Sequence, residues 1–350
     1  MKIGIFGSGS DTQCIAIAAA LKRLAVDHLI VEVDDINLGE EFSFDGEKFF
    51  YKGKDLDDVG AWYSRYVIST FPDVFSLNDD YFLYKDWLIE YMRKIERLGF
   101  QLSMLKLLSL KKIPVINLPD SGNAVQLKLF QLGLAKHVGL KTPKTLISNN
   151  IERIKNFVKN VKNVIYKPSM GGGFCHNFEK DDFERLEQIV KSPVTFQEKI
   201  EGTSVRATIV NNEVVSCVLL PSTHFNYRES PTYIDGKQEY NEIKLPHDVA
   251  EKIFKFLEIY GLIFSGIDFI LDKHGNFIFL EANASPLYLD IELKTGHPIS
   301  AKIASLLVHW ANYPNLHQDF ISKRKEKSFV SYALPFSKTT SVGGPYEKHN

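Results

Sequence analysis

The stretch FLEANAS, residues 279–285, ends an apolar run on polar side chains. Two apolar residues are followed by Glu281, Ala282 and Asn283. Successive side chains of a β-strand point to opposite faces, so Glu281 and Asn283 share one face. Carboxylates are rarely buried without a partner, so a strand entering a core should not end in this way. The two side chains are therefore candidates for a site.

The residues before this stretch, SGIDFILDKHGN, predict that FIFLEAN is the second strand of a β-hairpin. A two-residue turn at HG (274–275) pairs Lys273 with Asn276. Counting back from that turn places Asp268 opposite Glu281, with Cβ atoms roughly 5 Å apart. A four-residue loop keeps this register, whereas a three-residue loop would break it.

Two carboxylates at this spacing repel by roughly 3 kcal/mol at an effective dielectric of about 20, so they need a cation. Two carboxylates and an amide oxygen suit Mg²⁺, with Mn²⁺ as a second candidate. The sequence thus predicts a metal site at Asp268, Glu281 and Asn283. Two other interpretations stay open: charges splayed into water at a sheet end, and a carboxylate pair that shares a proton for acid–base catalysis.

Composition limits the classes of function. The chain has 350 residues, 44% hydrophobic and 24% charged, which indicates two or three domains. A net charge of −1 creates no global field for nucleic acid or an anionic membrane. Three widely spaced cysteines, no signal peptide at the start and no membrane-spanning stretch predict a cytoplasmic protein without nucleic-acid or membrane partners.

The N-terminal part predicts a parallel α/β unit. KIGIFG, TQCIAIAAALKRL and HLIVEV are typical of a strand, a helix and a strand. A helix follows over residues 81–110, and KKIPVINLP predicts a strand that closes this domain near residue 118. GSGSD lacks the glycine of a dinucleotide fingerprint, because position 12 is Thr12, so a plain strand-to-helix turn is favoured.

The rest of the chain predicts helices and antiparallel hairpins. One helix begins at Asp120 or Ser121 and ends near Gly139, and another ends at Gly261. A hairpin turns at NNE, and HPISAKIASLLVHWAN predicts a closing helix. The predicted domains are 1–118, 119–193 and 194–320, followed by a charged, then Gly- and Ser-rich tail over 321–350.

The segment YKPSMGGG combines a cation with flexible backbone donors. Lys167 ends a strand, Ser169 offers a hydroxyl, and Gly171, Gly172 and Gly173 leave their N–H groups open to a phosphate. A mobile hairpin tip is the alternative interpretation.

A connector and two basic residues complete the candidates. The connector QEKI (Gln197, Glu198, Lys199 and Ile200) ends a strand and is able to present backbone groups and a carboxylate to an adenine edge. Arg206 lies on the outgoing strand, and Lys128 lies mid-helix among leucines. An exposed strand end, a surface arginine and a snorkelling lysine are the respective alternatives.

The order of these pieces resembles the ATP-grasp superfamily, and within it the RimK-like ligases, over roughly residues 112–312. The resemblance implies an α/β and α+β fold, in which a Rossmann-like (pre-ATP-grasp) domain precedes two α+β domains that grip ATP. AWYSRY, VINLP and ELKTGHPISAKIASLL further resemble the microviridin-type ligases, which modify ribosomally made peptides.

The resemblance also implies residue roles. Lys128 and Lys167 contact the nucleotide phosphates under a lid at 169–173, and residues 197–200 form the adenine hinge. Arg206 stabilises the transferring phosphate, and Asp268, Glu281 and Asn283 hold two Mg²⁺ ions. Ser204 replaces an acidic ribose-binding residue, and Ala284 replaces a proline. Arg65, and Arg228 in the loop 221–241, are candidates for substrate binding.

The implied reaction activates a carboxylate with ATP as an acyl phosphate, which an amine or a hydroxyl then attacks. The leading substrate is a peptide or protein such as a ribosomal precursor, and a free amino acid or small molecule is the alternative. A nucleotide-binding module without turnover is a hypothesis from another class, and a dinucleotide oxidoreductase is disfavoured. A homodimer is compatible with these expectations.

Overall fold

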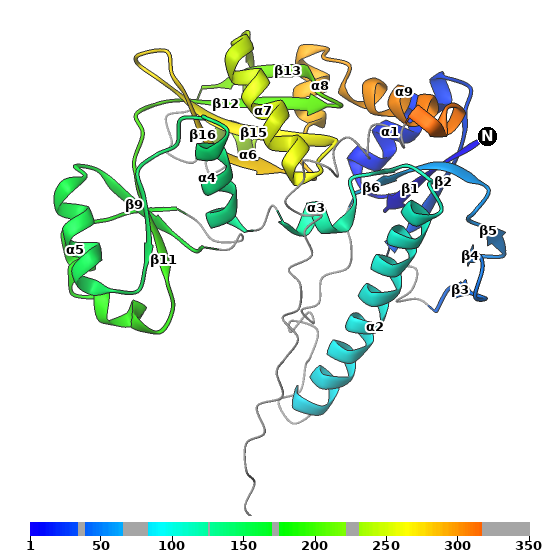
Figure 1. Ribbon diagram of the computed structural model, residues 1–350, viewed down its shortest axis with the longest axis horizontal. Coiled ribbons are helices and arrows are strands. Elements are labelled where there is room, and N and C mark those ends of the chain that lie inside the picture. The colour runs from blue at the N-terminus through cyan, green and yellow to red at the C-terminus, as the bar shows by residue number, and fades with distance from the viewer. Residues whose placement is uncertain (34–38, 66–82, 125–126, 170–174, 222–230, 317–350) are drawn as a thin grey trace, which may run out of the picture.

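The computed structural model describes residues 1–33, 39–65, 83–124, 127–169, 175–221 and 231–316. Strands in these ranges form four sheets. In Figure 1 the three larger parts lie in a row, with a small antiparallel sheet at the left, a central antiparallel sheet in the middle and a parallel sheet at the right. This mixture of helices with parallel and antiparallel sheets agrees with the predicted α/β and α+β class.

The parallel sheet belongs to the N-terminal α/β unit. Its order is β2-β1-β6-β7, with β1 (Lys2–Gly7), β2 (Asp27–Glu32), β6 (Val59–Ser64) and β7 (Val115–Ile116). Helix α1 (Thr12–Arg23) joins β1 to β2, so the predicted strand–helix–strand unit is confirmed. Asp11 caps this helix and accepts hydrogen bonds from the N–H groups of Gln13 and Cys14 at 2.8 and 3.0 Å.

A three-stranded sheet of order β3-β4-β5 also belongs to the N-terminal part, and no clear sequence pattern predicts it. Its short strands are β3 (Phe42–Phe44), β4 (Phe49–Tyr51) and β5 (Lys54–Asp55). The long helix α2 (Leu83–Leu110) extends away from the sheets in Figure 1. It agrees with the helix predicted over 81–110, whose first two residues lie outside the described ranges.

The helix predicted from residue 120 to Gly139 is interrupted, which corrects the sequence interpretation. Helix α3 (Pro119–Ala124) is followed by α4 (Lys128–His137). Helix α3 contacts α2, whereas α4 packs on the central sheet, so the two helices serve different neighbours. Lys128 is therefore the first residue of a helix, and the prediction that it lies mid-helix is wrong.

The small antiparallel sheet has the order β10-β9-β11-β8. Its strands are β8 (Thr145–Ser148), β9 (Val164–Lys167), β10 (His176–Asn177) and β11 (Val194–Glu198). Helix α5 (Ile151–Asn160) and the 3₁₀ helices η3 (Lys180–Phe183) and η4 (Leu186–Lys191) accompany it. Strands β9 and β10 pair antiparallel on either side of residues 170–174, which lie outside the description.

The central antiparallel sheet has the order β14-β13-β12-β15-β16. Its strands are β12 (Gly202–Val210), β13 (Glu213–Leu220), β14 (Asn241–Glu242), β15 (Phe264–Asp272) and β16 (Phe277–Asn283). One face packs against α4 and α7 (His247–Tyr260) in a core that includes Ala207, Ile267 and Phe279. Helix α7 ends where Gly261 adopts a φ of 71°, as predicted.

The β15–β16 hairpin contains the predicted carboxylate pair but reaches it by another route. Near the turn Leu271 pairs with Phe277, one residue away from the predicted register, so the predicted Lys273–Asn276 pair is wrong. A β-bulge at Leu280 then shifts the register and places Asp268 opposite Glu281, as predicted.

The same bulge decides which face Glu281 occupies. Phe277 and Phe279 face the core, and regular alternation would send Glu281 there too. Beyond the bulge Ala282 and Ala284 are the core residues instead. Glu281 consequently lies on the opposite face, next to the side chains of Asp268 and its strand neighbours.

The C-terminal helices return to the N-terminal unit. After the short α6 (Pro231–Ile234) and α8 (Leu289–Thr295), helix α9 (Ile299–Asn312) packs on α1 and β6. One core cluster joins Ile3 and Ile5 of β1 to Ile303 and Leu307 of α9. The domain limits at 118, 193 and 320 stay predictions, and the tail 321–350 lies outside the described residues.

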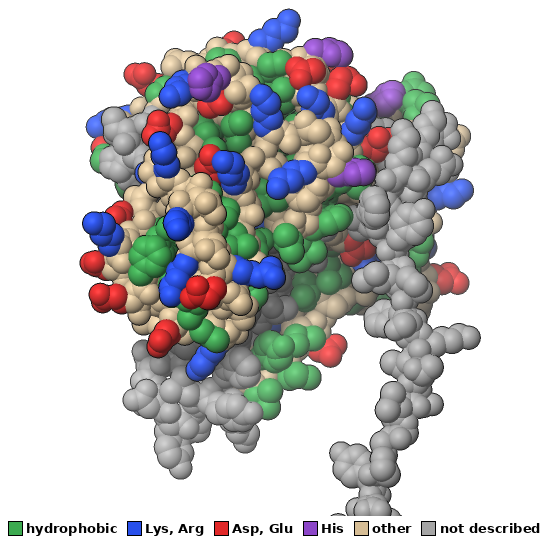
Figure 2. Space-filling view, turned by 60° about the vertical axis from the view of Figure 1, so that its left-hand side comes forward, with side chains coloured by type: hydrophobic (Ala, Val, Ile, Leu, Met, Phe, Trp, Pro, Cys, Tyr) green, Lys and Arg blue, Asp and Glu red, His purple; other side chains and the backbone are tan. Residues whose placement is uncertain are grey.

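The surface carries both signs of charge. Lysine, arginine, aspartate and glutamate side chains are interspersed over the face seen in Figure 2. Among the helices that the structure describes, none has the length and apolar composition of a bilayer-crossing segment.

Candidate functional site

A cavity of about 180 Å³ is lined by residues of the β10-β9-β11-β8 sheet and of the central sheet. Strand ends and connectors of both sheets contribute apolar walls and four charged groups. The lining residues are Ile165, Lys167, Cys175, Gln197, Glu198, Ile200, Ser204, Val205, Leu220, Asp268, Phe269, Ile270, Leu280 and Glu281. An apolar cleft with a few convergent polar groups is typical of a small-molecule site. We call it the sheet cavity.

Asp268, which lines this cavity, is paired with Arg206. The two residues are opposite each other on β12 and β15. The Nε–H and Nη2–H groups of Arg206 donate to Oδ1 and Oδ2 of Asp268, both at 2.7 Å, in a bidentate ion pair. Arg206 is only 3% exposed. A buried guanidinium needs such a partner, so the two side chains hold each other in one geometry.

Glu281 has its own cation. The ammonium of Lys128 forms a salt bridge and hydrogen bond with Oε2 of Glu281. A positive charge in the first turn of α4 opposes the helix dipole, and the nearby carboxylate offsets that cost. Protein cations therefore already compensate both carboxylates of the predicted metal site.

Lys167 brings a second ammonium to the sheet cavity from the end of β9. Burial lowers the pKa of Lys167, and Lys128 acts in the same direction, whereas Cys175 and Glu281 raise it. Within the described residues this ammonium makes no hydrogen bond. A partly desolvated cation of this kind is well suited to an anionic ligand.

The connector QEKI is tied to its neighbours by its backbone. The N–H groups of Glu198 and Lys199 donate to the carbonyls of Lys144 and Asn163 at 2.8 and 2.9 Å. The carboxylate of Glu198 also accepts from the N–H of Lys144 at 3.2 Å. The sheet cavity is lined by Gln197, Glu198 and Ile200. Because the N–H groups of Glu198 and Lys199 are already used, a ligand there must contact other groups of the connector.

The predicted phosphate loop is described only at its first residues. Ser169 Oγ lies 3.0 Å from Thr195 Oγ1 and 3.3 Å from the carbonyl of Pro193, which ties it to β11. Gly171, Gly172 and Gly173 lie outside the described residues, and so does Arg228. Ser204 lines the sheet cavity from β12.

Asn283 lies two residues beyond Glu281 and is already engaged. Its Oδ1 accepts a hydrogen bond from the N–H of Ser285 at 3.0 Å. No group of three His, Cys, Asp or Glu side chains is arranged for a metal ion within the described residues. Two carboxylates and one amide nevertheless fit a magnesium site chemically, because each oxygen keeps a lone pair beside its present partner.

A second pocket, of about 330 Å³, is lined by Arg206 of this ion pair. Its walls come from the start of α1, from β13 and from the segment after β16. The lining residues are Thr12, Gln13, Arg206, Leu220, Tyr240, Leu287, Leu289, Asp290, Ile291 and Leu293. We call it the junction pocket. Among these residues Arg206 was predicted by name, and Tyr240 belongs to the loop 221–241 that the sequence associates with substrate binding.

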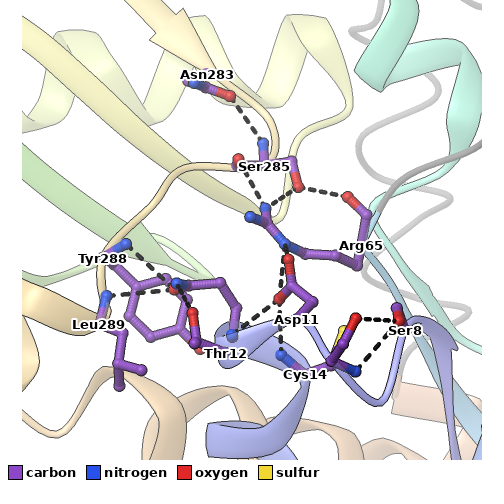
Figure 3. Close-up of polar contacts among 11 residues, drawn as sticks. Ser8, Asp11, Thr12, Cys14, Arg65, Asn283, Ser285, Tyr288 and Leu289 are labelled. Atoms are coloured by element: carbon purple, nitrogen blue, oxygen red, sulfur yellow. Dashed lines mark hydrogen bonds and ion pairs between the residues drawn. The ribbon is translucent and has the colours of Figure 1, made fainter. Parts of the chain in front are cut away.

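Arg65 lines neither hollow. It is 6% exposed, and its guanidinium contacts Asp11 and Ser285 (Figure 3). The contact joins the N-terminal unit to the residues that follow Asn283.

Known proteins share this architecture. The structure of the ATP-grasp ligase PsnB complexed with minimal precursor, Mg and ADP superposes with a TM-score of 0.76 at 23% identity, over 88% of this chain and 97% of that chain. The macrocyclase MdnC of Microcystis aeruginosa MRC, bound with its precursor peptide MdnA, gives 0.71 at 20% identity, over 88% and 100%. At these identities the likeness establishes a shared ATP-grasp fold.

Sequence comparison points the same way. A D-alanine–D-alanine ligase of Francisella philomiragia is 28% identical over 137 residues, which are 35% of this chain and 45% of that protein. The chain thus spans about half the length of the D-alanine–D-alanine ligases that it matches. The model of the RimK-like ATP-grasp domain matches residues 125–307, which is more than half of the chain. The chain therefore belongs to the RimK-like ATP-grasp family.

Proposed function

We propose that this protein is an ATP-dependent carboxylate–amine ligase. The nucleotide occupies the sheet cavity, with its phosphates toward Lys128, Lys167 and the segment 169–173. The base lies along residues 197–200, and the acceptor substrates enter the junction pocket. Family membership and the chemistry of the lining residues support this arrangement.

One observation carries the proposal: a bidentate ion pair links the linings of the two hollows, which also share Leu220. Asp268 lines the sheet cavity and Arg206 lines the junction pocket, while their side chains are joined at 2.7 Å. In this arrangement the γ-phosphoryl group near Asp268 and the substrate carboxylate near Arg206 meet beside this ion pair, where the carboxylate oxygen is able to contact the phosphorus directly. Arg206 is then placed to stabilise the negative charge that is transferred.

The first step is phosphoryl transfer. A substrate carboxylate oxygen attacks the γ-phosphorus, the bond to the bridging oxygen of ADP breaks, and an acyl phosphate forms. Lys167 and Arg206 neutralise charge on either side, and Asp268, Glu281 and Asn283 would hold magnesium. When bound, that ion supplies charge neutralisation on the phosphate oxygens.

The second step forms the product bond. An amine nitrogen attacks the acyl carbon, inorganic phosphate leaves, and the nitrogen releases its proton to solvent. A hydroxyl acceptor would give an ester by the same route. Neither step uses a protein nucleophile, because the phosphate itself is the leaving group. The residues of the chain position the reactants and balance charge.

A peptide or protein is the substrate class that we favour. PsnB and MdnC, which share the fold, were solved with precursor peptides. The junction pocket offers apolar walls from Leu287, Leu289 and Leu293, with polar groups at Thr12 and Asp290, which suits side chains better than a single small ion. The likeness to D-alanine–D-alanine ligases favours a free amino acid as the second candidate.

An isotope experiment tests the reaction. Candidate peptides carrying ¹⁸O in their side-chain carboxylates are incubated with the protein, MgATP and amine or hydroxyl acceptors. Acyl phosphate formation transfers one labelled oxygen to the phosphate product, which mass spectrometry detects. ADP release without label transfer would contradict ligation through an acyl phosphate. Nucleotide binding without any ADP release, across peptides and free amino acids, would favour the non-catalytic module instead.

Several related expectations stay predictions. We propose two magnesium ions, with Mn²⁺ able to replace them, and a cytoplasmic location without nucleic-acid or membrane partners. We also propose a homodimer, which sedimentation equilibrium checks directly. A monomer over the working concentration range would contradict it.

A further inference from the structure

Three polar side chains meet where the N-terminal unit contacts the end of β16 (Figure 3). Arg65 follows β6, and its N–H donates to the carbonyl of Phe6 on β1 at 2.9 Å. Its Nε–H lies 3.2 Å from Oδ2 and 3.3 Å from Oδ1 of Asp11. Its Nη1–H donates to the carbonyl of Ser285 at 2.8 Å and also to the Ser285 hydroxyl oxygen. That hydroxyl donates in turn to the carbonyl of Arg65.

This cluster is buried and its geometry is strongly constrained. The side chains of Arg65 and Asp11 are 7% and 17% exposed. A guanidinium is a planar fork of donors, so its hydrogen bonds fix orientation as well as distance. Asp11 is itself fixed, because its carboxylate caps α1. Arg65 therefore connects three elements of the N-terminal unit to Ser285.

Ser285 passes this constraint to Asn283. The N–H of Ser285 donates to Oδ1 of Asn283 at 3.0 Å, which is the hydrogen bond of an Asx turn. That bond selects one orientation of the Asn283 side chain. Moving Ser285 away from Arg65 would release Asn283 to other rotamers.

A second side chain holds the far end of the same segment. The Oε1 atom of Gln13 accepts hydrogen bonds from the N–H groups of Tyr288 and Leu289, both at 3.2 Å. Gln13 is 3% exposed, and it also lines the junction pocket. The start of α1 thus grips residues 285–289 through Arg65 at one end and Gln13 at the other.

We propose that Arg65 is a positioning residue for the metal site: it holds Ser285 so that Asn283 presents its amide oxygen beside Asp268 and Glu281. This inference rests on the proposed function. It replaces direct substrate contact as the role of Arg65, because Arg65 lines neither the sheet cavity nor the junction pocket. The N-terminal unit acts on the chemistry through this contact.

Metal binding tests the proposal independently of turnover. Mn²⁺ is titrated into the full chain with saturating ADP and followed by electron paramagnetic resonance. Arg65→Met removes the fork but keeps an apolar side chain of similar length, and it leaves Asp11 to cap α1. Loss of a group that orients a metal ligand typically weakens metal affinity by about 10-fold to 100-fold, and we expect about 10-fold here.

Two further variants separate positioning from general loosening. Arg65→Lys keeps the charge near Asp11 and should restore part of the Mn²⁺ affinity. Ser285→Ala removes the hydroxyl contacts of Arg65 but keeps the N–H bond to Asn283, and should weaken Mn²⁺ binding about 3-fold. ADP affinity in EDTA, measured by calorimetry, should not change in any variant. Arg185→Met is the matched control, because Arg185 is 63% exposed in a surface ion pair.

Each outcome decides the proposal. Wild-type Mn²⁺ affinity in folded Arg65→Met would overturn it, and so would an equal loss of ADP affinity in EDTA. If Arg65→Met does not fold, Ser285→Ala decides alone, and unchanged Mn²⁺ affinity there overturns the proposal. If the wild-type protein binds ADP with no dependence on metal, the proposed function itself falls, a result distinct from the failure of Arg65 alone.

Discussion

The sheet cavity and the junction pocket are linked by one ion pair but are built differently. Strand ends and strand connectors of two sheets line the sheet cavity, where most functional side chains follow a local pattern. The junction pocket combines the start of α1 with residues 287–293, more than 270 positions later in the chain. Reaction chemistry is therefore encoded locally, whereas the surface that meets the acceptor depends on long-range packing.

The largest effect is expected where the two hollows meet. Asp268→Asn removes the negative charge that faces Arg206 and a metal ligand at once. Loss of one preorganised electrostatic group lowers kcat by about 10²-fold to 10³-fold. Steady-state turnover with the best acceptor measures the change.

Asp272→Asn is the matched control for that variant. Asp272 ends the same strand but holds the turn, where its Oδ1 accepts from the N–H groups of His274 and Asn276. It lines neither hollow, so stability should fall while kcat stays within about twofold. A kcat for Asp268→Asn within tenfold of wild type would contradict the role assigned to this ion pair.

Substitution of Lys167 in the sheet cavity should weaken ATP binding. Its ammonium makes no hydrogen bond within the described residues, unlike Lys128, which is paired with Glu281. A hydrogen bond to a charged group contributes about 1.5–3 kcal/mol, so Lys167→Met should weaken ATP binding by about 10-fold to 100-fold. Calorimetry measures the affinity, and Lys155→Met on exposed α5 serves as control. Equal ATP affinity in both variants would remove Lys167 from the site.

The junction pocket should respond in substrate KM and not in ATP affinity. Leu287 lines it and is 59% exposed, so Leu287→Ser removes apolar contact with little harm to the core. Partial loss of a leucine contact is worth about 1 kcal/mol, which predicts an increase of about 5-fold in acceptor KM. Leu110→Ser, at the exposed end of α2, should leave both constants unchanged. A change in ATP KM for Leu287→Ser would show that the two hollows are not separate.

Most of the sheet cavity could be predicted because its signals are short-range. The alternation of each strand and the turn residues located Lys167, Arg206 and Asp268. Glu281 was assigned to the right partner although the turn was predicted wrongly. The register at the turn differs by one residue from the prediction, and the bulge at Leu280, which has no reliable sequence signal, shifts it back by one residue. The pairing was thus correct even though the path to it was not.

The junction pocket and the Arg65 cluster could not be predicted, because their contacts span most of the chain. Arg65 and Ser285 are 220 positions apart, and Gln13 and Leu289 are 276 apart. Nothing local distinguishes Gln13 from any polar residue in the first turn of a helix. The break between α3 and α4 was missed for a related reason, since it reflects what each helix packs against.

The lowered pKa of Lys167 predicts a pH dependence of stability. Burial disfavours its charged form, so the folded protein loses this proton at a lower pH than the unfolded chain does. Between the lowered value and the usual 10.5, the unfolded chain binds more protons, and the free energy of unfolding rises with pH. In urea unfolding without nucleotide, the free energy of unfolding of the wild type should increase relative to that of Lys167→Met as pH rises from 7 toward 10. Parallel pH profiles would contradict this.

The smallest effect concerns Ser204, which lines the sheet cavity. The resemblance to ATP-grasp ligases predicts an acidic ribose-binding residue at this position. Ser204→Glu adds a carboxylate on the face that also holds Arg206 and Asp268, which pair with each other two positions along the β12–β15 ladder. A new hydrogen bond contributes about 0.5–1.5 kcal/mol, so ATP should bind about 3-fold more tightly. Ser204→Gln has the same size without the charge and separates hydrogen bonding from electrostatics. If neither variant changes ATP affinity, a different group already contacts the ribose. The sheet cavity would then also depend on a residue that no local sequence pattern predicts. In that respect it would be more similar to the junction pocket.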